Sequence, residues 1–508
     1  MTETSANQLS VQSTQSPAES PASEKYTARS GPIVGVLAFS GIVAAVMQTL
    51  VVPLIGEMPE LLGTSASNAT WVVTATLLAA AVCTPITGRL GDLYGKKPVM
   101  LACSLLLVAG SVVCALATAL IPMIVGRSLQ GAAMGLVPLG ISAMRDLLPP
   151  EKLGTSIALM SASMGIGGAL GLPIAAAVAE YSTWHALFWG ATALAVMVAA
   201  FICFFLPATP VTAHGKFDPA GAAGLGIGLV CLLLGVSKGA DWGWTSGLTL
   251  GLLVASVLVF LAWGWFQLRT SDPLVDLRVT ARPVVLLTNL SSVVIGFAMY
   301  AQSLIVPQLL QLPTETGYGL GQNMFQMGLW MAPGGVMMMM IAPVGARISY
   351  SRGPKITLAI GAAVMAAGYL AAVALMGSTW GLLVSVCITN VGVGFAYGAM
   401  PALIMGSVKS SETGAANSLN TLMRSIGTSV SAAVVGVVLA NMTTDFFGLS
   451  LPSEAGFHTG LLIGAAVAIV AAIIALLIPS PATKKSDAIS DHAAREETGT
   501  ADTASMHP

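Results

Sequence analysis

Charged residues are scarce in this sequence. Asp, Glu, Lys and Arg together make up 8% of the 508 residues, whereas a typical soluble domain contains about 25%. Hydrophobic residues make up 55% of the chain, so most of the molecular surface must face lipid. The net charge of −1 gives no general attraction for nucleic acid, and we expect no nucleic-acid partner.

Cysteine and histidine are also rare, with six and five residues. All six cysteines lie in apolar runs without a C-x-x-C pair, which indicates packed or lipid-facing side chains rather than disulfides or metal ligands. The histidines are scattered without zinc-site spacing. The sequence has no phosphate-binding G-x-x-x-x-G-K-[ST] loop and no cluster of His, Asp and Glu. We therefore expect no enzyme, no metal site and no cofactor.

What the chain has instead is a series of apolar segments of about 20 residues, the length that a helix needs to cross a bilayer. They predict an all-α integral membrane protein. The fourteen predicted helices lie near residues 33–55, 69–88, 98–118, 121–142, 155–179, 184–207, 219–236, 248–268, 284–306, 325–346, 356–376, 381–404, 415–440 and 459–479. The polar ends, residues 1–31 and 481–508, are predicted to be disordered cytoplasmic tails.

Lys and Arg fall in alternate gaps between the apolar segments. If the N-terminus is cytoplasmic, 18 of the 21 basic residues lie in cytoplasmic loops or tails, and only Lys238 lies outside. This bias follows the positive-inside rule. It predicts a multi-pass protein of the plasma membrane with both termini in the cytoplasm. The last two basic residues, Arg127 and Arg424, lie deep within predicted helices, where a charge is costly and usually faces a cavity or a partner.

A weak internal repeat relates two parts of the chain. The segment from Gly154 to Gly167 aligns with that from Gly414 to Gly427 at a constant offset of 260 residues. We interpret residues 32–207 and 271–480 as two six-helix bundles and residues 208–270 as two inserted central helices. Transporters often have such repeats, with the substrate site at their interface. The alternative is chance similarity between helices that are rich in Gly, Ala and Ser.

A short polar segment joins the second and third predicted helices. It contains Gly88, Asp92, Gly95, Lys96 and Lys97. Its glycines permit a tight turn and close helix approach. The carboxylate of Asp92 can accept hydrogen bonds from the free N–H groups at a helix start in the other bundle. We predict a gating loop, with the lysines at the anionic inner leaflet. The alternative is a basic loop that only sets the topology.

Two further patterns lie in the fourth and fifth predicted helices. Arg127 and Gln130 are three residues apart and share one helix face, which we expect to line the central cavity or to meet the first helix. The alternative is a structural Arg paired with backbone carbonyls. In the fifth helix, Gly167 and Gly171 form a G-x-x-x-G pair, which lets helices pack closely, and Pro173 follows.

These segments resemble motifs of the major facilitator superfamily, and the resemblance spans about residues 32–480. The residues that match its signatures are Gly88, Leu90, Asp92, Gly95, Lys96, Lys97, Arg127, Gln130 and Gly131. The glycine pair and Pro173 resemble the exporter motif, with Leu172 interposed. The two extra helices make the chain similar to the fourteen-helix drug:proton antiporter branch. The resemblance implies the major facilitator fold and a role in proton coupling for Arg127.

The first helix departs from that branch. Its members usually carry an Asp there for proton coupling, whereas this chain has Gln48, which cannot carry a titratable proton. Other polar side chains predicted to line the pathway are Gln302, Asn417, Asn420 and Arg424. The last three share one helix face. Two buried arginines without an acid in mid-membrane predict a cavity that favours neutral or anionic substrates over lipophilic cations.

The sequence as a whole predicts a secondary active transporter that exports small amphipathic compounds or drugs by alternating access. Its expected partners are a small-molecule substrate, protons and the lipid bilayer, and we expect a monomer. Transport of one specific metabolite, inward or outward, is an alternative. A membrane sensor or scaffold that transports nothing is another, although a sensor normally includes a sizeable soluble domain.

Overall fold

The computed structural model describes residues 30–479 except residues 52, 53, 55, 56, 210, 212, 214, 447 and 448. Ser30 and Gly31 already belong to the first helix. The rest of both predicted tails lies outside the described residues.

The described part of the chain contains fourteen spans that are long and apolar enough to cross a membrane, as the sequence predicted. The first six spans are α2 (Ser30–Thr49), α5 (Trp71–Tyr94), α6 (Lys96–Leu116), α7 (Leu120–Ala132) continued by η2 (Ala133–Gly135) and α8 (Leu136–Leu147), α9 (Pro150–Tyr181) and α10 (Trp184–Phe205). The two inserted spans are α11 (Pro219–Trp242) and α12 (Gly247–Arg269). The last six spans are α14 (Pro283–Gln311), α15 (Met324–Arg352), α16 (Pro354–Leu375), α17 (Thr379–Ser407), α18 (Thr413–Asn441) and α19 (Glu454–Leu477).

Short elements complete the described structure. They are α3 (Met58–Leu61), α4 (Ala66–Ala69), α13 (Leu277–Thr280), η3 (Thr314–Thr316), η4 (Ser410–Glu412), β1 (Thr443–Phe446) and β2 (Leu449–Pro452). The two strands pair antiparallel in a hairpin between α18 and α19. The first span, α2, ends at Thr49, before the predicted end at residue 55. In the sequence, Pro53 follows four residues later, and proline disfavours the continuation of a helix.

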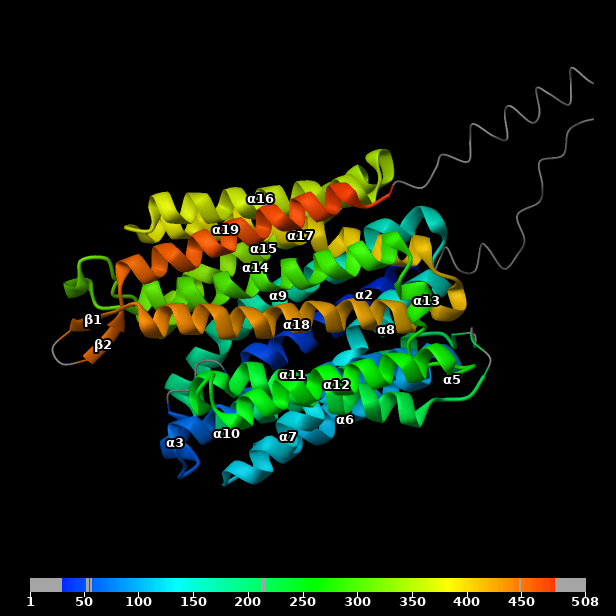
Figure 1. The fold of residues 1–508 in the computed structure, drawn as a ribbon, viewed down its shortest axis with the longest axis horizontal. Helices are drawn as coiled ribbons and strands as arrows, with labels where there is room; N and C mark the ends of the chain where they lie inside the picture. Colours follow the sequence, from blue (N-terminus) through cyan, green and yellow to red (C-terminus); the bar gives the residue numbers. More distant parts are fainter. Residues whose placement is uncertain are drawn as a thin grey trace, which may run out of the picture.

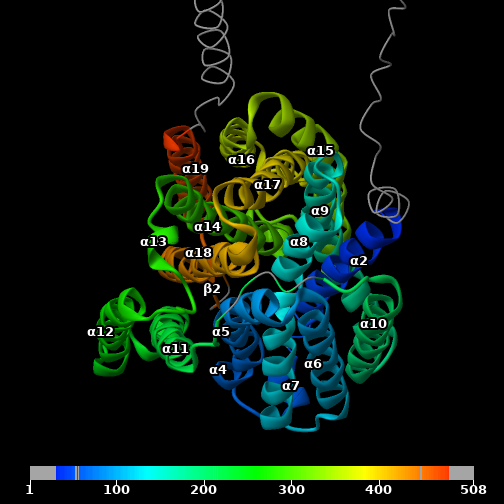
Figure 2. The same ribbon diagram turned by 90° about the vertical axis from the view of Figure 1, so that its right-hand side faces the viewer.

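Each of the two bundles has its own large apolar core. One core joins α2 and α5–α10, and the other joins α14–α19. The bundles meet mainly along two helix pairs, α9 with α15 and α5 with α18. Helix α9 also contacts α17, and α8 contacts α18. Figure 1 shows the long helices running in one general direction, and Figure 2 looks along them, with the second bundle above the first.

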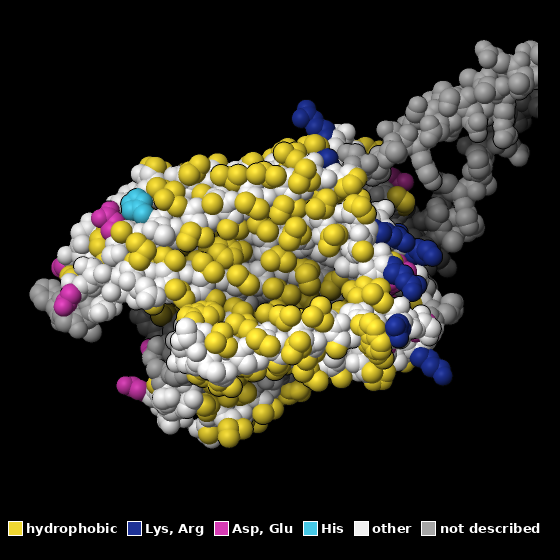
Figure 3. All heavy atoms as spheres, viewed as in Figure 1, with side chains coloured by type: hydrophobic (Ala, Val, Ile, Leu, Met, Phe, Trp, Pro, Cys, Tyr) yellow, Lys and Arg dark blue, Asp and Glu magenta, His cyan; other side chains and the backbone are white. Residues whose placement is uncertain are grey.

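Charged side chains gather at the two ends of the helices, while hydrophobic side chains cover the surface between them (Figure 3). We call the end that carries Arg89, Arg145, Arg352 and Lys409 the basic end. The opposite end, with Glu60, Glu315 and Glu454, is the acidic end. This separation is what a positive-inside topology requires.

The inserted helices form a hairpin beside the junction of the bundles (Figure 2). Gln267 Nε2 donates to Asp218 Oδ2 at 2.9 Å, and Trp263 Nε1 donates to Gly221 O at 2.8 Å, so α11 and α12 are joined near the basic end. An apolar cluster that includes Leu225, Leu229, Leu419 and Leu422 packs α11 against α18 and α5. The inserted hairpin therefore contacts both bundles.

Candidate functional site

The segment predicted as a gating loop is almost wholly helical, so that part of the prediction is wrong. Gly88 and Asp92 belong to α5, Lys96 and Lys97 begin α6, and Gly95 alone joins the helices with a φ of 90°. Glycine adopts this positive φ without strain, so one residue is enough to reverse the chain. Gly353 makes the same turn between α15 and α16 with a φ of 87°.

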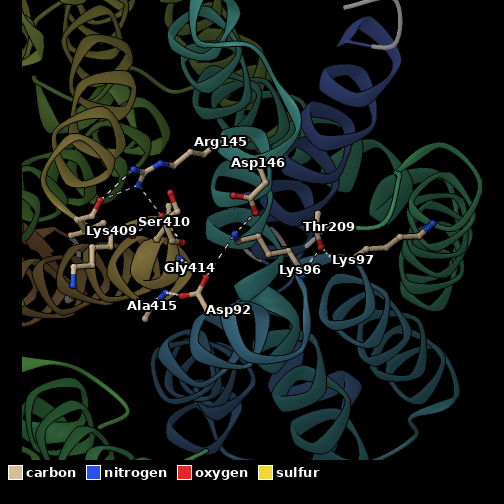
Figure 4. A network of polar contacts seen from close by, with 12 residues as sticks. Asp92, Lys96, Lys97, Arg145, Asp146, Thr209, Lys409, Ser410, Gly414 and Ala415 are labelled. Carbon is tan, nitrogen blue, oxygen red and sulfur yellow. Dashed lines mark hydrogen bonds and ion pairs between the residues drawn. The ribbon is translucent and has the colours of Figure 1, made fainter. Parts of the chain in front are cut away.

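Asp92 joins the two bundles at the basic end. Its Oδ1 accepts a hydrogen bond from Gly414 N at 3.0 Å, and its Oδ2 accepts one from Ala415 N at 2.9 Å (Figure 4). Both N–H groups belong to the first turn of α18, where the helix dipole favours a negative charge. A Cβ at Gly88 would lie 2.6 Å from Gly414 O, so glycine is what permits the approach. The hydrogen-bonding pattern predicted for Asp92 is confirmed.

Lys96 is fully buried, contrary to the prediction that it lies at the inner leaflet. Its ammonium group forms an ion pair with the Asp146 carboxylate and lies 3.8 Å from Asp92 Oδ1. The N–H groups of Lys96 and Lys97 both donate to Thr209 Oγ1, at 2.7 and 3.0 Å. The prediction failed because Asp146, on α8, and Thr209, after α10, supply polar partners that remove Lys96 from the lipid surface.

Arg145 makes a second polar connection between the bundles. Its Nη1 donates to Thr413 Oγ1 at 2.8 Å, and both Nη atoms lie 3.3 Å from Val408 O. Figure 4 shows this contact beside that of Asp92. The sequence predicted Arg145 only as one of the 18 basic residues on the cytoplasmic side. Its place at the end of the fourth span, next to Asp146, was the feature of the sequence that could have indicated a contact with the other bundle.

Arg127 is buried and bonded within the first bundle. Its Nη1 donates to Met47 O at 2.9 Å and to Gln130 Oε1 at 2.7 Å, and its Nε donates to Val72 O at 3.2 Å. Gln130 Nε2 in turn donates to Ser111 Oγ at 2.9 Å. This face was predicted to line the central cavity or to meet the first helix. The bond to Met47 O shows that it meets the first helix, α2. The carbonyl partners agree with the alternative prediction, a structural Arg that pairs with backbone carbonyls.

Gln48, on the last turn of α2, has an exposed side chain that lies 3.4 Å from the sulfur of Met134 in η2. Gln302 is buried in α14. The two predicted pathway residues are therefore in different bundles and in different environments.

The predicted polar face of α18 forms a buried cluster. Asn420 Nδ2 donates to Asn289 Oδ1 at 3.0 Å and to Ser292 Oγ at 2.7 Å. The guanidinium carbon of Arg424 lies 4.4 Å from the ring centroid of Tyr397. A cavity of about 10 Å³ adjoins the cluster between the two bundles. The residues that line the cavity are Ile141, Ser161, Met164, Tyr397, Pro401, Asn417, Asn420, Thr421 and Arg424.

The glycines of the fifth span lie where helices pack closely. A Cβ at Gly167 would be 2.3 Å from Ile42 O, and one at Gly171 would be 2.0 Å from Thr49 Oγ1, so both glycines face α2. Pro173 faces the other bundle, where a Cβ at Gly328 of α15 would lie 3.1 Å from its nitrogen. Helix α9 thus packs against α2 and α15 at once.

Among the described residues, no group of three or more His, Cys, Asp or Glu side chains is arranged to hold a metal ion. The polar contacts that we find between the two bundles, from Asp92 and Arg145, all lie at the basic end. The structure is therefore closed at that end.

The sequence model of the Major Facilitator Superfamily matches residues 37–432. The chain belongs to the major facilitator superfamily. The fold agrees: a solved structure of a proton:xylose symporter superposes with a TM-score of 0.63 at 13% identity, over 89% of this chain and 97% of that one. The predicted fold is confirmed.

Bacterial relatives are similar at low identity. An uncharacterized transporter of this superfamily from Bacillus subtilis, YhcA, is 27% identical over 60% of this chain and 57% of its own length. Multidrug resistance protein 3 of the same organism is 24% identical over 82% of this chain and 80% of its own length. This chain spans about three-fifths of the length of the first relatives, 57% and 61%. The relatives' names confirm the predicted likeness to the drug-efflux branch.

Proposed function

We propose that this superfamily member is a secondary active transporter that exports small amphipathic compounds by alternating access. The observation that carries the proposal is the closed basic end, where Asp92 and Arg145 of the first bundle bind the start of α18 in the second. Contacts of this kind can break without unfolding either bundle, because each bundle has its own core. The name of multidrug resistance protein 3 supports drugs as the substrate class.

The proposal places the basic end in the cytoplasm of a bacterial cell, with both termini there and the helices in the plasma membrane. The distribution of Lys and Arg supports this orientation. The proposed functional unit is a monomer, since a single polypeptide supplies both bundles and the junction between them.

The proposed gating residues are Gly88, Asp92, Gly95 and Lys96, with Lys97 as the partner of Thr209. Asp92 stabilises the state that is closed at the basic end, and Lys96 fixes the carboxylates around it. Arg127 and Gln130 hold the first helix to the fourth, and Gly167, Gly171 and Pro173 set the packing of α9.

Reconstitution of the purified full-length chain into liposomes with an imposed pH gradient tests the proposal. We expect uptake or release of several unrelated amphipathic dyes, at rates above those of empty liposomes. Proton coupling is part of the proposal. We therefore expect transport to fall when an ionophore collapses the pH gradient. Transport of one metabolite alone, or of nothing in any gradient, would contradict it.

A further inference from the structure

Arg424 is buried near the middle of the membrane, and the described residues give it no countercharge. It is 9% exposed, and it lies on α18 well inside the span Ser410–Asn441. The guanidinium stacks on the Tyr397 ring, and Nη2 makes one long contact of 3.4 Å with Thr421 Oγ1. Among the described residues, no carboxylate lies within ion-pair distance of it. The part of the chain that the structure describes therefore leaves this positive charge unneutralised.

Acidic residues in the described spans all lie near helix ends. They are Asp92, Asp146, Glu151, Glu180, Asp241, Glu412 and Glu454, each within five residues of an end of its span. The other mid-membrane arginine, Arg127, uses backbone carbonyls and Gln130 instead. The environment of Arg424 is consequently positive, and a buried positive site favours an anion.

Two neutral side chains beside Arg424 are buried without partners. Asn417, about two turns before Arg424, is 3% exposed, and neither its Nδ2 nor its Oδ1 has a hydrogen-bond partner. Ser161, on α9 of the other bundle, is 2% exposed, and its Oγ also lacks a partner. Both line the cavity that Arg424 lines. Buried polar atoms without partners destabilise a structure, so these groups are available to bond a ligand that enters the cavity.

We propose that Arg424, Asn417 and Ser161 bind the anionic group of the transported compound, a carboxylate or similar oxyanion on an amphipathic organic molecule. The inference rests on the proposed transport function and names its substrate class. Arg offers a planar fork of donors that suits a carboxylate, and the Asn amide and the Ser hydroxyl add two neutral donors. A lipophilic cation would meet the Arg424 charge there without an acid to balance it.

The volume of the cavity relates this site to the transport cycle. At about 10 Å³, the cavity holds a single water and is too small for a carboxylate. Its lining comes from both bundles, with Ile141, Ser161 and Met164 from the first and the rest from the second. Separation of the bundles at the basic end would enlarge it. The anion thus binds while the basic end is open, because the closed state described here leaves no room for it.

Two xanthene dyes provide a matched test. Fluorescein carries a free carboxylate, and rhodamine 6G has an esterified carboxyl group and a positive charge. Binding of each dye to the purified full-length protein is measured by fluorescence polarisation, and transport of each is measured in liposomes. The variants are Arg424→Gln, Arg424→Lys and Ser161→Ala. The control is Arg352→Gln, which removes an exposed charge at the basic end.

We expect wild type to bind fluorescein at least about tenfold more tightly than rhodamine 6G, as charge-assisted hydrogen bonds imply. Arg424→Gln removes this preference, Arg424→Lys keeps part of it, and Arg352→Gln leaves it unchanged. Ser161→Ala weakens fluorescein binding several-fold without lowering the melting temperature, because it deletes an unpartnered hydroxyl. If Arg424→Gln does not fold, Ser161→Ala tests whether the anion site exists.

Equal binding of the two dyes by wild type, or an equal loss of both in Arg424→Gln, overturns the anion site. Dye transport that does not depend on Arg424 also overturns it, while the proposed transport function stands. Conversely, fluorescein binding that depends on Arg424, without transport of any compound, supports the site and contradicts the transport function.

Discussion

Asp92 and Gly414 are 322 residues apart in the chain, and a hydrogen bond of 3.0 Å joins them across the two bundles. The acceptor is a buried carboxylate, and the donor is a backbone N–H at the start of a helix. Hydrogen bonds to charged groups contribute about 1.5–3 kcal/mol each, so this contact and its neighbour at Ala415 can set the balance between two states of a transporter.

Replacing Asp92 with Asn should lower transport without preventing membrane insertion. Asparagine has one acceptor oxygen in place of two and no charge, so one of the two N–H groups of α18 loses its partner. We expect about 1.5–3 kcal/mol less stabilisation of the state closed at the basic end, equivalent to a population shift of about tenfold or more. Flux in liposomes at matched protein content is the measurement. A wild-type flux would remove Asp92 from the mechanism.

Replacing Lys96 with Met should destabilise the folded protein strongly. It would leave the carboxylates of Asp92 and Asp146 without their shared cation in a buried site, at a cost of roughly 3–5 kcal/mol. The thermal melting temperature of the purified protein is the readout. Lys97→Met is the matched control, because the Lys97 ammonium makes only an exposed contact with Cys203 O.

Asp146→Leu combined with Lys96→Met should recover part of the loss, since removing both members of a buried ion pair is often close to neutral. A melting temperature of Lys96→Met equal to that of Lys97→Met would show that the ion pair contributes nothing to stability.

Two adjacent glycines of α9 should respond differently to alanine. The new Cβ at Gly167 would lie 2.3 Å from Ile42 O, whereas a Cβ at Gly168 meets nothing within 4 Å. Overpacking costs about 1–3 kcal/mol, so Gly167→Ala should melt at a lower temperature than wild type. Gly168→Ala should be neutral or slightly stabilising, because alanine favours helix by roughly 0.5–1 kcal/mol. Equal melting temperatures would contradict the observed α9–α2 packing.

Impermeant thiol reagents can test the topology. Tyr94 and Tyr350 are 61% and 94% exposed at the basic end, and Glu60 is exposed at the acidic end. With the exposed Cys203 replaced by Ala, cysteines introduced one at a time at positions 94 and 350 should react in inverted vesicles, and one introduced at position 60 should react in intact cells. Labelling of positions 94 and 350 from opposite sides would overturn the threading of the chain.

The sequence predicted features that follow from local chemistry. The fourteen spans follow from segment length and hydropathy, and the contact of Asp92 with a helix start follows from the unpaired N–H groups that every helix start presents. The helical extent of the segment from Gly88 to Lys97 was missed, because a single positive-φ glycine replaces what looks like a polar loop.

Residues whose partners are distant in the chain could not be assigned. The burial of Lys96 depends on Asp146, 50 residues later, and the role of Arg145 depends on Thr413, 268 residues later. The three residues of the α18 face were predicted to lie together because they recur at helical spacing. Ser161, on the other side of the cavity, has no such spacing to mark it.

The inserted hairpin indicates where the polypeptide could be divided into two genes. Lys238 of α11 contacts Thr70 and the Trp71 ring at the acidic end, and Ala213 N, in the segment before α11, donates to Asp92 O at the other end. The hairpin and the segment that leads to it therefore have polar contacts with the first bundle at both ends. Against α18, helix α11 packs through leucines. Co-expressed fragments cut after residue 270 would therefore reassemble better than fragments cut before α11, because the hairpin would stay with the N-terminal fragment.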